Sequence, residues 1–168
     1  MFVSTIGFAQ ETETLTEAFG HHQIGVLLAH THMRAGEVNA SKNRLSVPSF
    51  TLFYNYRFNE TWSLGLHTDF VAEQFVAQSI DGEGDAIERE RPVAPAIMLG
   101  FKPGKHFTFL VGGGVDIDAE ETLGLVRMDV EYGLEITKGW EFIAALGYDM
   151  RFGGYDSFQL GVGMAKGF

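Results

Sequence analysis

The last ten residues of the chain, residues 159–168 (QLGVGMAKGF), alternate between two kinds of side chain. In this register one face of a strand is apolar and holds Leu160, Val162, Met164 and Phe168. The other face carries Gln159 and small residues. Successive side chains of a β-strand point to opposite sides, so this alternation predicts a strand with one apolar face and one small, polar face.

Seven further segments of the chain repeat the pattern. They span residues 20–31, 47–58, 62–75, 93–101, 107–118, 125–136 and 140–152. Across all eight apolar faces the only Lys, Arg, Asp or Glu is Lys166, near the end of the chain. The opposite faces hold charged residues interleaved with Gly and Ser. The pattern therefore predicts an all-β chain of eight strands.

The connections between these segments alternate in length. Tight links lie at residues 59–61, 102–105 and 137–139, long polar links at 33–44 and 78–91, and shorter ones at 119–122 and 153–156. Tight turns on one side and longer loops on the other are typical of an up-and-down membrane barrel. We therefore expect an eight-stranded antiparallel transmembrane β-barrel with short periplasmic turns, longer extracellular loops and both termini in the periplasm.

A soluble, lipocalin-like ligand-binding barrel is an alternative, because two-faced strands alone do not say which face lies inside. Two features favour the membrane barrel. The apolar faces are almost free of charge, and aromatic residues collect at strand ends as in an interfacial girdle. These aromatic residues are Tyr56, Phe58, Trp62, Phe101, Phe107, Trp140 and Phe168.

Composition excludes several classes of function. No apolar run reaches the roughly 18 residues that a membrane helix needs, so any crossing must be made by strands. The chain of 168 residues has no cysteine, which excludes thiolate nucleophiles and Cys-based metal sites. A net charge of −10 argues against nucleic acid as a partner, because nucleic acid binding requires basic patches.

The chain divides into three parts. Residues 1–9 resemble the remnant of a signal peptide, with Gly7 and Ala9 as the small residues before a cleavage at Gln10. Residues 10–19 are expected to form an N-terminal periplasmic segment, and residues 20–168 the barrel.

The stretch from residue 20 to residue 168 resembles the small eight-stranded outer-membrane proteins of the OmpA, OmpX and OmpW kind, by its strand pattern and its terminal aromatic residue. The resemblance implies a location in the bacterial outer membrane, among outer-membrane lipids and lipopolysaccharide. It also implies insertion by the barrel-assembly machinery. Phe168, with Met164 and Val162, would form the assembly signal that this machinery recognises.

Five charged residues are expected at similar heights on the polar faces of three consecutive strands: Asp116, Arg127, Asp129, Asp149 and Arg151. Cross-strand neighbours on one face lie about 5 Å apart, so opposite charges there should pair. An eight-stranded lumen is just wide enough to be filled by side chains. We therefore expect a packed network of salt bridges rather than a solvated ion path.

Two groups of residues are weak candidates for metal binding. Asp81, Glu83 and Asp85 alternate with glycines as at the start of a calcium loop, but the terminal Glu is missing at the expected spacing. A solvated acidic loop, or one that meets lipopolysaccharide through divalent cations, is the alternative. His30 and His32 share one face but have no third ligand. We expect neither a resident metal nor another cofactor.

No cluster of nucleophile, base and orienting acid is evident, so we expect no enzyme. The sequence favours a non-enzymatic barrel that acts as a structural or interaction component through its surface loops, where a protein partner would bind. Passage of small apolar or cationic solutes is the alternative. It rests on Pro95, which lies in mid-strand and together with Pro48 predicts bulges or a weakened seam in the wall.

Overall fold

The computed structural model describes residues 20–34, 44–78, 86–119 and 121–168. The strands in this part of the chain are β1 (His22–Met33), β2 (Leu45–Arg57), β3 (Trp62–Val71), β4 (Gln74–Gln78), β5 (Ala86–Glu90), β6 (Val93–Phe101), β7 (Phe107–Ile117), β8 (Thr122–Thr137), β9 (Trp140–Arg151) and β10 (Asp156–Gly167). Eight of them close into an antiparallel barrel in the order β1-β10-β9-β8-β7-β6-β3-β2. The closed barrel confirms the predicted fold class.

The hairpin formed by β4 and β5 was not predicted, and the expected polar link over residues 78–91 was wrong in this respect. The third barrel strand was also expected to continue to Phe75, but it ends at Val71. Phe75 instead lies in the hairpin with its side chain buried. Residues 72–77 (AEQFVA) show no clear two-residue alternation, so periodicity does not fix where the wall strand ends.

Apolar side chains cover the outside of the barrel, and polar side chains fill much of its inside. Leu28 and Leu160 are 67% and 61% exposed on the outer wall, whereas Thr51, Asn55 and His67 are buried in the lumen. An apolar surface that surrounds the whole wall is the face that a transmembrane barrel presents to lipid. The lipocalin-like alternative, which needs an apolar lumen, is therefore wrong. None of the described residues belongs to a helix that could cross a membrane.

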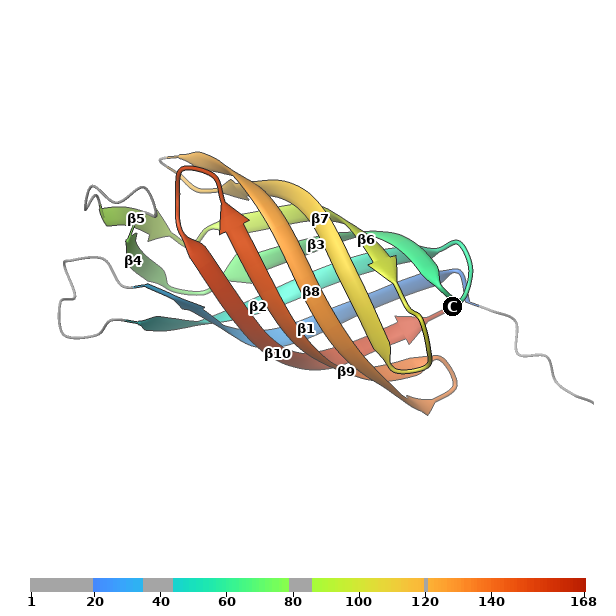
Figure 1. Ribbon diagram of the computed structural model, residues 1–168. Helices are drawn as coiled ribbons and strands as arrows, with labels where there is room; N and C mark the ends of the chain where they lie inside the picture. The colour runs from blue at the N-terminus through green and yellow to red at the C-terminus, as the bar shows by residue number, and fades with distance from the viewer. Residues whose placement is uncertain (1–19, 35–43, 79–85, 120) are drawn as a thin grey trace, which may run out of the picture.

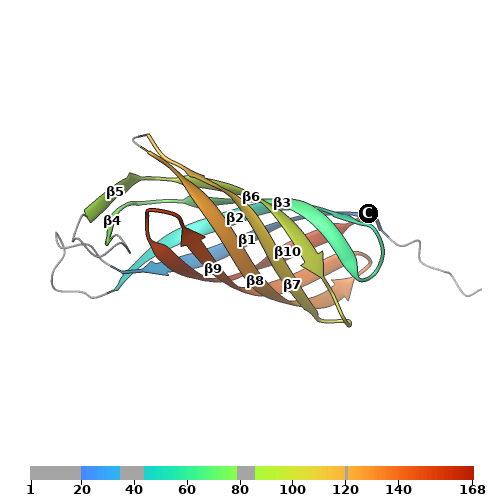
Figure 2. The same cartoon turned by 45° about the horizontal axis from the view of Figure 1, so that its top comes forward.

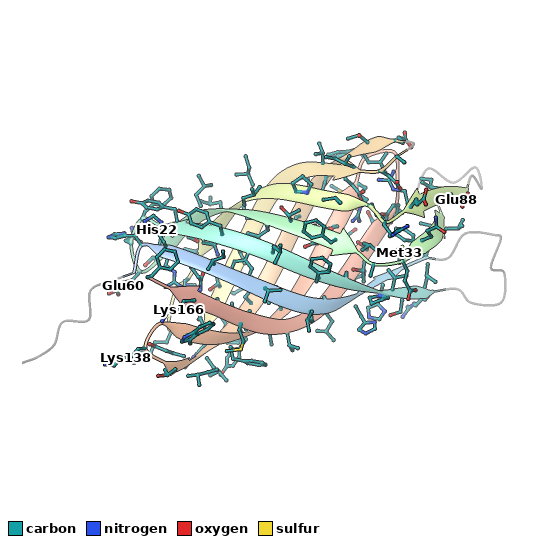
Figure 3. The ribbon with its side chains drawn as sticks, turned by 180° about the vertical axis from the view of Figure 1, so that it is seen from behind. His22, Met33, Glu60, Glu88, Lys138 and Lys166 are labelled. Carbon is teal, nitrogen blue, oxygen red and sulfur yellow. The ribbon has the colours of Figure 1, made fainter. Side chains whose placement is uncertain are left out.

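The two ends of the barrel differ. The tight turns at residues 58–61, 102–106 and 138–139 lie at one end with the C-terminus, and we call this the short-turn end. The β4–β5 hairpin lies at the opposite end, which we call the long-loop end (Figures 1 and 2). Figure 3 marks the long-loop end by Met33 and Glu88 and the short-turn end by His22, Glu60, Lys138 and Lys166.

Aromatic rings form pairs on the outer wall near the short-turn end. Trp62 lies 4.8 Å from Phe101 between ring centroids, and Phe107 lies 5.1 Å from Tyr132. Trp and Tyr, whose rings combine an apolar body with a polar N–H or O–H group, suit the boundary between lipid tails and headgroups. The predicted girdle is therefore present, and all its predicted members belong to this one end.

The barrel closes where its first strand meets its last. β1 and β10 pair without interruption from Gln23–Gly167 to Met33–Ser157. Beyond this ladder, the Phe168 amide donates to the His22 carbonyl at 2.9 Å, and the His22 amide donates to the Phe168 carbonyl at 3.0 Å. The two rings also stack, with centroids 5.6 Å apart. The terminal aromatic residue thus completes the wall.

The wall is closed at the predicted seam around Pro95. β6 and β7 lack ladder pairs at Ala94 and Pro95, but the register before and after this gap is the same, so no bulge occurs. Gly114 of β7 approaches so closely that a Cβ atom there would collide with the Pro95 carbonyl oxygen. Glycine permits this close approach. Among the described strands of the barrel, the register shifts elsewhere, between Glu135 and Thr137 of β8.

Candidate functional site

The lumen near the long-loop end is crossed by a chain of ion pairs. Arg127 of β8 lies 2.6 Å from Asp69 of β3, two strands that are separated along the wall by β6 and β7. This pair therefore spans the interior rather than joining neighbours. Arg127 also makes a two-pronged contact with Asp149 of β9, at 2.7 and 2.8 Å. Two parallel hydrogen bonds of this kind give the strongest form of Arg–carboxylate pair.

The chain continues from Asp149 to the next inward residue of β9. Arg151 lies 3.2 Å from Asp149 and also donates to Asp116 of β7. Its third donor reaches the Ser157 hydroxyl at 2.8 Å. The Arg151 guanidinium further lies 4.4 Å above the centre of the Tyr155 ring, in cation–π contact.

Tyr155 lies in the link between β9 and β10, where its side chain is buried against the Arg151 guanidinium. Its hydroxyl donates to Asp116 at 3.2 Å. Burial, with smaller contributions from charged neighbours, raises the pKa of the Tyr155 hydroxyl above its usual range. The group therefore remains a neutral donor at any physiological pH.

Arg89 ties the β4–β5 hairpin to this chain. Its side chain is 1% exposed and lies 2.6 Å from Asp116 and 3.4 Å from Asp118. It also donates to the backbone carbonyls of Glu121 at 2.9 Å and of Asp116 at 3.2 Å. An arginine buried to this extent needs such partners, because a buried unpaired charge is costly. The hairpin is thus held against the mouth of the barrel.

An apolar cluster surrounds the same mouth from inside. Its buried members come from β1 to β4, β8 and the last link, and they are Met33, Val47, Val71, Phe75, Ala77, Leu123 and Tyr155. Phe75 and Tyr155 meet edge to face, with centroids 5.5 Å apart. Burial of this cluster stabilises the position of the hairpin independently of the ion pairs.

Four of the five residues predicted to share a charge network are joined by ion pairs: Asp116, Arg127, Asp149 and Arg151. Asp129 takes part in none of these ion pairs. Its Oδ1 atom is buried with no hydrogen-bond partner among the described residues. Sequence reasoning missed Asp69, Arg89 and Asp118 as members. The sequence indicates that Asp69 points inward and that Arg89 and Asp118 lie near loops. It does not predict that Asp69 and Arg89 meet charged residues of β8 and β7.

The short-turn end is different, because it holds an open cavity of about 820 Å³. Glu141 of β9 reaches into it and is held by Lys102 at 3.1 Å, Arg57 at 3.5 Å and the Gln23 side-chain amide at 2.9 Å. These partners come from β1, β2 and the turn after β6. The lumen is therefore filled at the long-loop end and hollow at the short-turn end.

The other predicted site residues fall in two places. Val162, Met164 and Phe168 lie on the lipid-facing side of the last strand and just after it, all exposed. The candidate calcium ligands Asp81, Glu83 and Asp85 lie outside the described residues. Within the described part of the chain, no group of three or more His, Asp or Glu residues is placed to hold a metal ion.

These features define a class of protein: a transmembrane β-barrel of eight strands whose polar lumen is filled by side chains at one end. Solved structures of the same fold are small outer-membrane barrels. Neisserial surface protein A matches with a TM-score of 0.59 and 10% identity, over 90% of this chain and 100% of that one. Ail of Yersinia pestis, in complex with the heparin analogue sucrose octasulfate, matches with a TM-score of 0.58 and 14% identity, over 89% and 99%.

The outer membrane protein OprG from Pseudomonas aeruginosa is a third match, with a TM-score of 0.52 and 13% identity, over 89% of this chain and 98% of that one. Similarity at these identities is a similarity of fold. No protein-family model matches the chain, and the search of curated proteins also gives no match.

Proposed function

We propose that the protein is a non-enzymatic barrel of the bacterial outer membrane, sealed against solutes, which acts as an interaction component at its long-loop end. The observation that carries the proposal is the position of Arg89. One arginine of the β4–β5 hairpin is buried in the ion-pair chain that crosses the lumen. The hairpin therefore belongs to the group of side chains that fills the long-loop end of the lumen, which we call the plug. Its outer side is held in a fixed position where a partner could bind.

The same geometry argues against the alternative of solute passage. The charged groups near the mouth pair with one another, and the apolar cluster fills the space around them. A lateral route through the wall finds no support at Pro95, where the neighbouring strand is in close contact. A lumen of this strand number is usually filled by side chains, as it is here.

The outer side of the hairpin region is acidic. Glu73, Glu88 and Glu90 are exposed there, beside the exposed Arg91, while the exposed Arg34 and Arg44 flank β1 and β2 at the same end. Surfaces that bind each other have complementary potentials. We therefore expect a protein partner with a basic surface. A polysulfate such as the ligand in the Ail structure would be repelled by this region.

The proposal also states how the barrel is oriented in the outer membrane and which molecules it contacts. The long-loop end would face the cell exterior, with the short turns and both termini in the periplasm. Outer-membrane lipids would contact the apolar wall, and lipopolysaccharide the outer rim. The barrel-assembly machinery would insert the chain, with Phe168, Met164 and Val162 as its recognition signal. Short turns on the periplasmic side are the rule for barrels of this kind.

Cysteine labelling tests the orientation directly, because the chain has no cysteine of its own. Glu88→Cys at the hairpin should react with a membrane-impermeant maleimide on intact cells. Lys105→Cys at a short turn should react only after the outer membrane is permeabilised. Labelling in the reverse pattern would overturn the orientation.

Binding tests the proposed role. Purified protein in nanodiscs should bind a lysine-rich peptide, and the double variant Glu88→Lys, Glu90→Lys should lose this binding. Both side chains are exposed, so the variant should fold normally. A peptide that binds the double variant equally well, or sucrose octasulfate that binds the unchanged protein better than the peptide does, would contradict the proposal.

A further inference from the structure

The cavity at the short-turn end contains a buried carboxylate without a partner. Glu131 of β8 lines the cavity and is only 7% exposed. Among the described residues it has neither a hydrogen bond nor an ion pair. A buried ionised group in this situation is strongly disfavoured unless a ligand or a proton neutralises it.

The nearby described cations make no hydrogen bond or ion pair with Glu131. Arg57 and Lys102 both form ion pairs with Glu141 and act on Glu131 only over a longer distance. Lys105 and Lys138 also line the cavity but are exposed at its rim, where water screens them. The inner end of the cavity is therefore negative, although its lining as a whole carries both signs.

Two further carboxylates extend this negative region along the same strand. Asp129 is the next inward residue beyond Glu131. It interacts electrostatically with Arg127, but its Oδ1 atom is buried without a hydrogen-bond partner among the described residues. Glu135 lies on the other side, exposed at the cavity rim, and has no ion pair in the described part of the chain. Side chains on one face of a strand recur about every 7 Å, so the three carboxylates form a row.

From this arrangement we propose that the cavity binds a linear polyamine, with one ammonium group against Glu131 and another toward Glu135. The ligand enters from the short-turn end. An ammonium group donates three hydrogen bonds and accepts none, which fits a carboxylate that has no other donor. The distance from Glu131 to Glu135, roughly 13 Å along the strand, matches an extended chain with several amines rather than a single small ion.

A single metal ion fits the row poorly. Among the described residues, the carboxylates of this row are not grouped with two further His, Asp or Glu ligands that could complete the coordination of a metal ion. The cavity of about 820 Å³ leaves room for a ligand of polyamine size beside the Glu141 group. This site lies at the opposite end from the hairpin, so the proposal does not depend on the sealed mouth or on the acidic hairpin surface.

Titration calorimetry with spermidine tests the site, on the full protein in nanodiscs of zwitterionic lipid. Glu131→Gln should weaken spermidine binding at least about tenfold, the effect of removing a charged hydrogen-bond partner. Glu135→Gln should weaken it less, because Glu135 is exposed. Glu73→Gln removes the same charge at the long-loop end and should leave binding unchanged.

Glu131→Gln removes a buried unpaired charge, so the variant should fold at least as well as the unchanged protein. Heat-modifiable migration on gels checks this for each variant. N-acetylated spermidine, which lacks one terminal ammonium, should bind more weakly than spermidine. Equal affinity for the Glu131→Gln variant, or displacement of spermidine by sodium as readily from this variant as from the unchanged protein, would overturn the proposal.

Discussion

Arg127 has two carboxylate partners from different strands, and its removal tests the importance of a pair that crosses the lumen. Arg127→Met should lower the free energy of unfolding by about 3–5 kcal/mol, because Asp69 and Asp149 would lose their shared cation in a buried site. Urea unfolding in lipid vesicles, followed by tryptophan fluorescence, measures the change.

Arg57→Met is the matched control. Arg57 is partly exposed, and its partner Glu141 retains Lys102. Its loss should cost about 1 kcal/mol or less, as for exposed ion pairs. If both variants lose the same stability, then the crossing pair contributes no more than an exposed one.

At the residue level, alternation predicts which way a side chain points but not what it meets on the far side. Asp116, Arg127, Asp149 and Arg151 could be grouped from the sequence because tight turns fix the register of neighbouring strands. The contact between Asp69 and Arg127 could not, since it depends on how the barrel closes. Asp129 points into the lumen at the height of the network, as predicted, yet its Oδ1 atom has no hydrogen-bond partner among the described residues.

At the level of the element, the β4–β5 hairpin depends on one buried side chain. Arg89→Ala removes its ion pairs with Asp116 and Asp118 and its bonds to two backbone carbonyls. We expect faster hydrogen exchange at the amides of both hairpin strands, while the barrel strands keep their protection. Mass spectrometry of peptides from residues 74–78 and 86–90 reads this out.

Glu88→Ala provides the comparison, because Glu88 is exposed on the same strand. It should leave hairpin exchange as it is in the unchanged protein. Unaltered exchange in Arg89→Ala would mean that the apolar cluster alone holds the hairpin. The hairpin also marks a limit of what the sequence predicts. β5 (AIERE) lies in a charged stretch where a loop is the simpler expectation, and β4 (QFVAQ) follows a wall strand after a gap of only two residues.

The last strand carries a separate prediction about assembly. Deletion of Phe168 removes a ring stacked on His22 and two backbone hydrogen bonds, but none of the lumen contacts. We expect reduced insertion in cells together with nearly normal refolding in detergent, since recognition rather than core packing would be lost. Phe168→Tyr keeps the ring and should insert normally. Equal insertion of the deleted and unchanged chains would count against a recognition role.

For the molecule as a whole, the filled long-loop end predicts almost no ion flow. The unchanged protein in planar bilayers should show at most small, rare openings. The double variant Arg127→Ala, Arg151→Ala leaves Asp69, Asp116 and Asp149 facing the lumen without these cations. It should admit water and give cation-selective openings. A large, steady, anion-selective current through the unchanged protein would contradict the plug and the placement of the acidic face.

The fold of the whole molecule was readable because lipid imposes a strict pattern on every wall strand. The apolar wall, the strand number and the alternating link lengths all follow from that requirement. The lumen obeys no comparable rule, because polar side chains of either charge can occupy it provided that they find partners. The difference between a filled end and a hollow end therefore became visible only with the three-dimensional arrangement.

The ladder between β1 and β10 also constrains the order of folding. It pairs residues as distant as Gln23 and Gly167, so the wall cannot close until β10 is available to pair with β1. Closing so large a loop carries an entropic cost that local hairpins do not have. The neighbouring hairpins can form early, but the open sheet keeps two unpaired edges until β10 pairs with β1. During that interval the chain is most exposed to aggregation, and a product that lacks β10 would remain an open sheet.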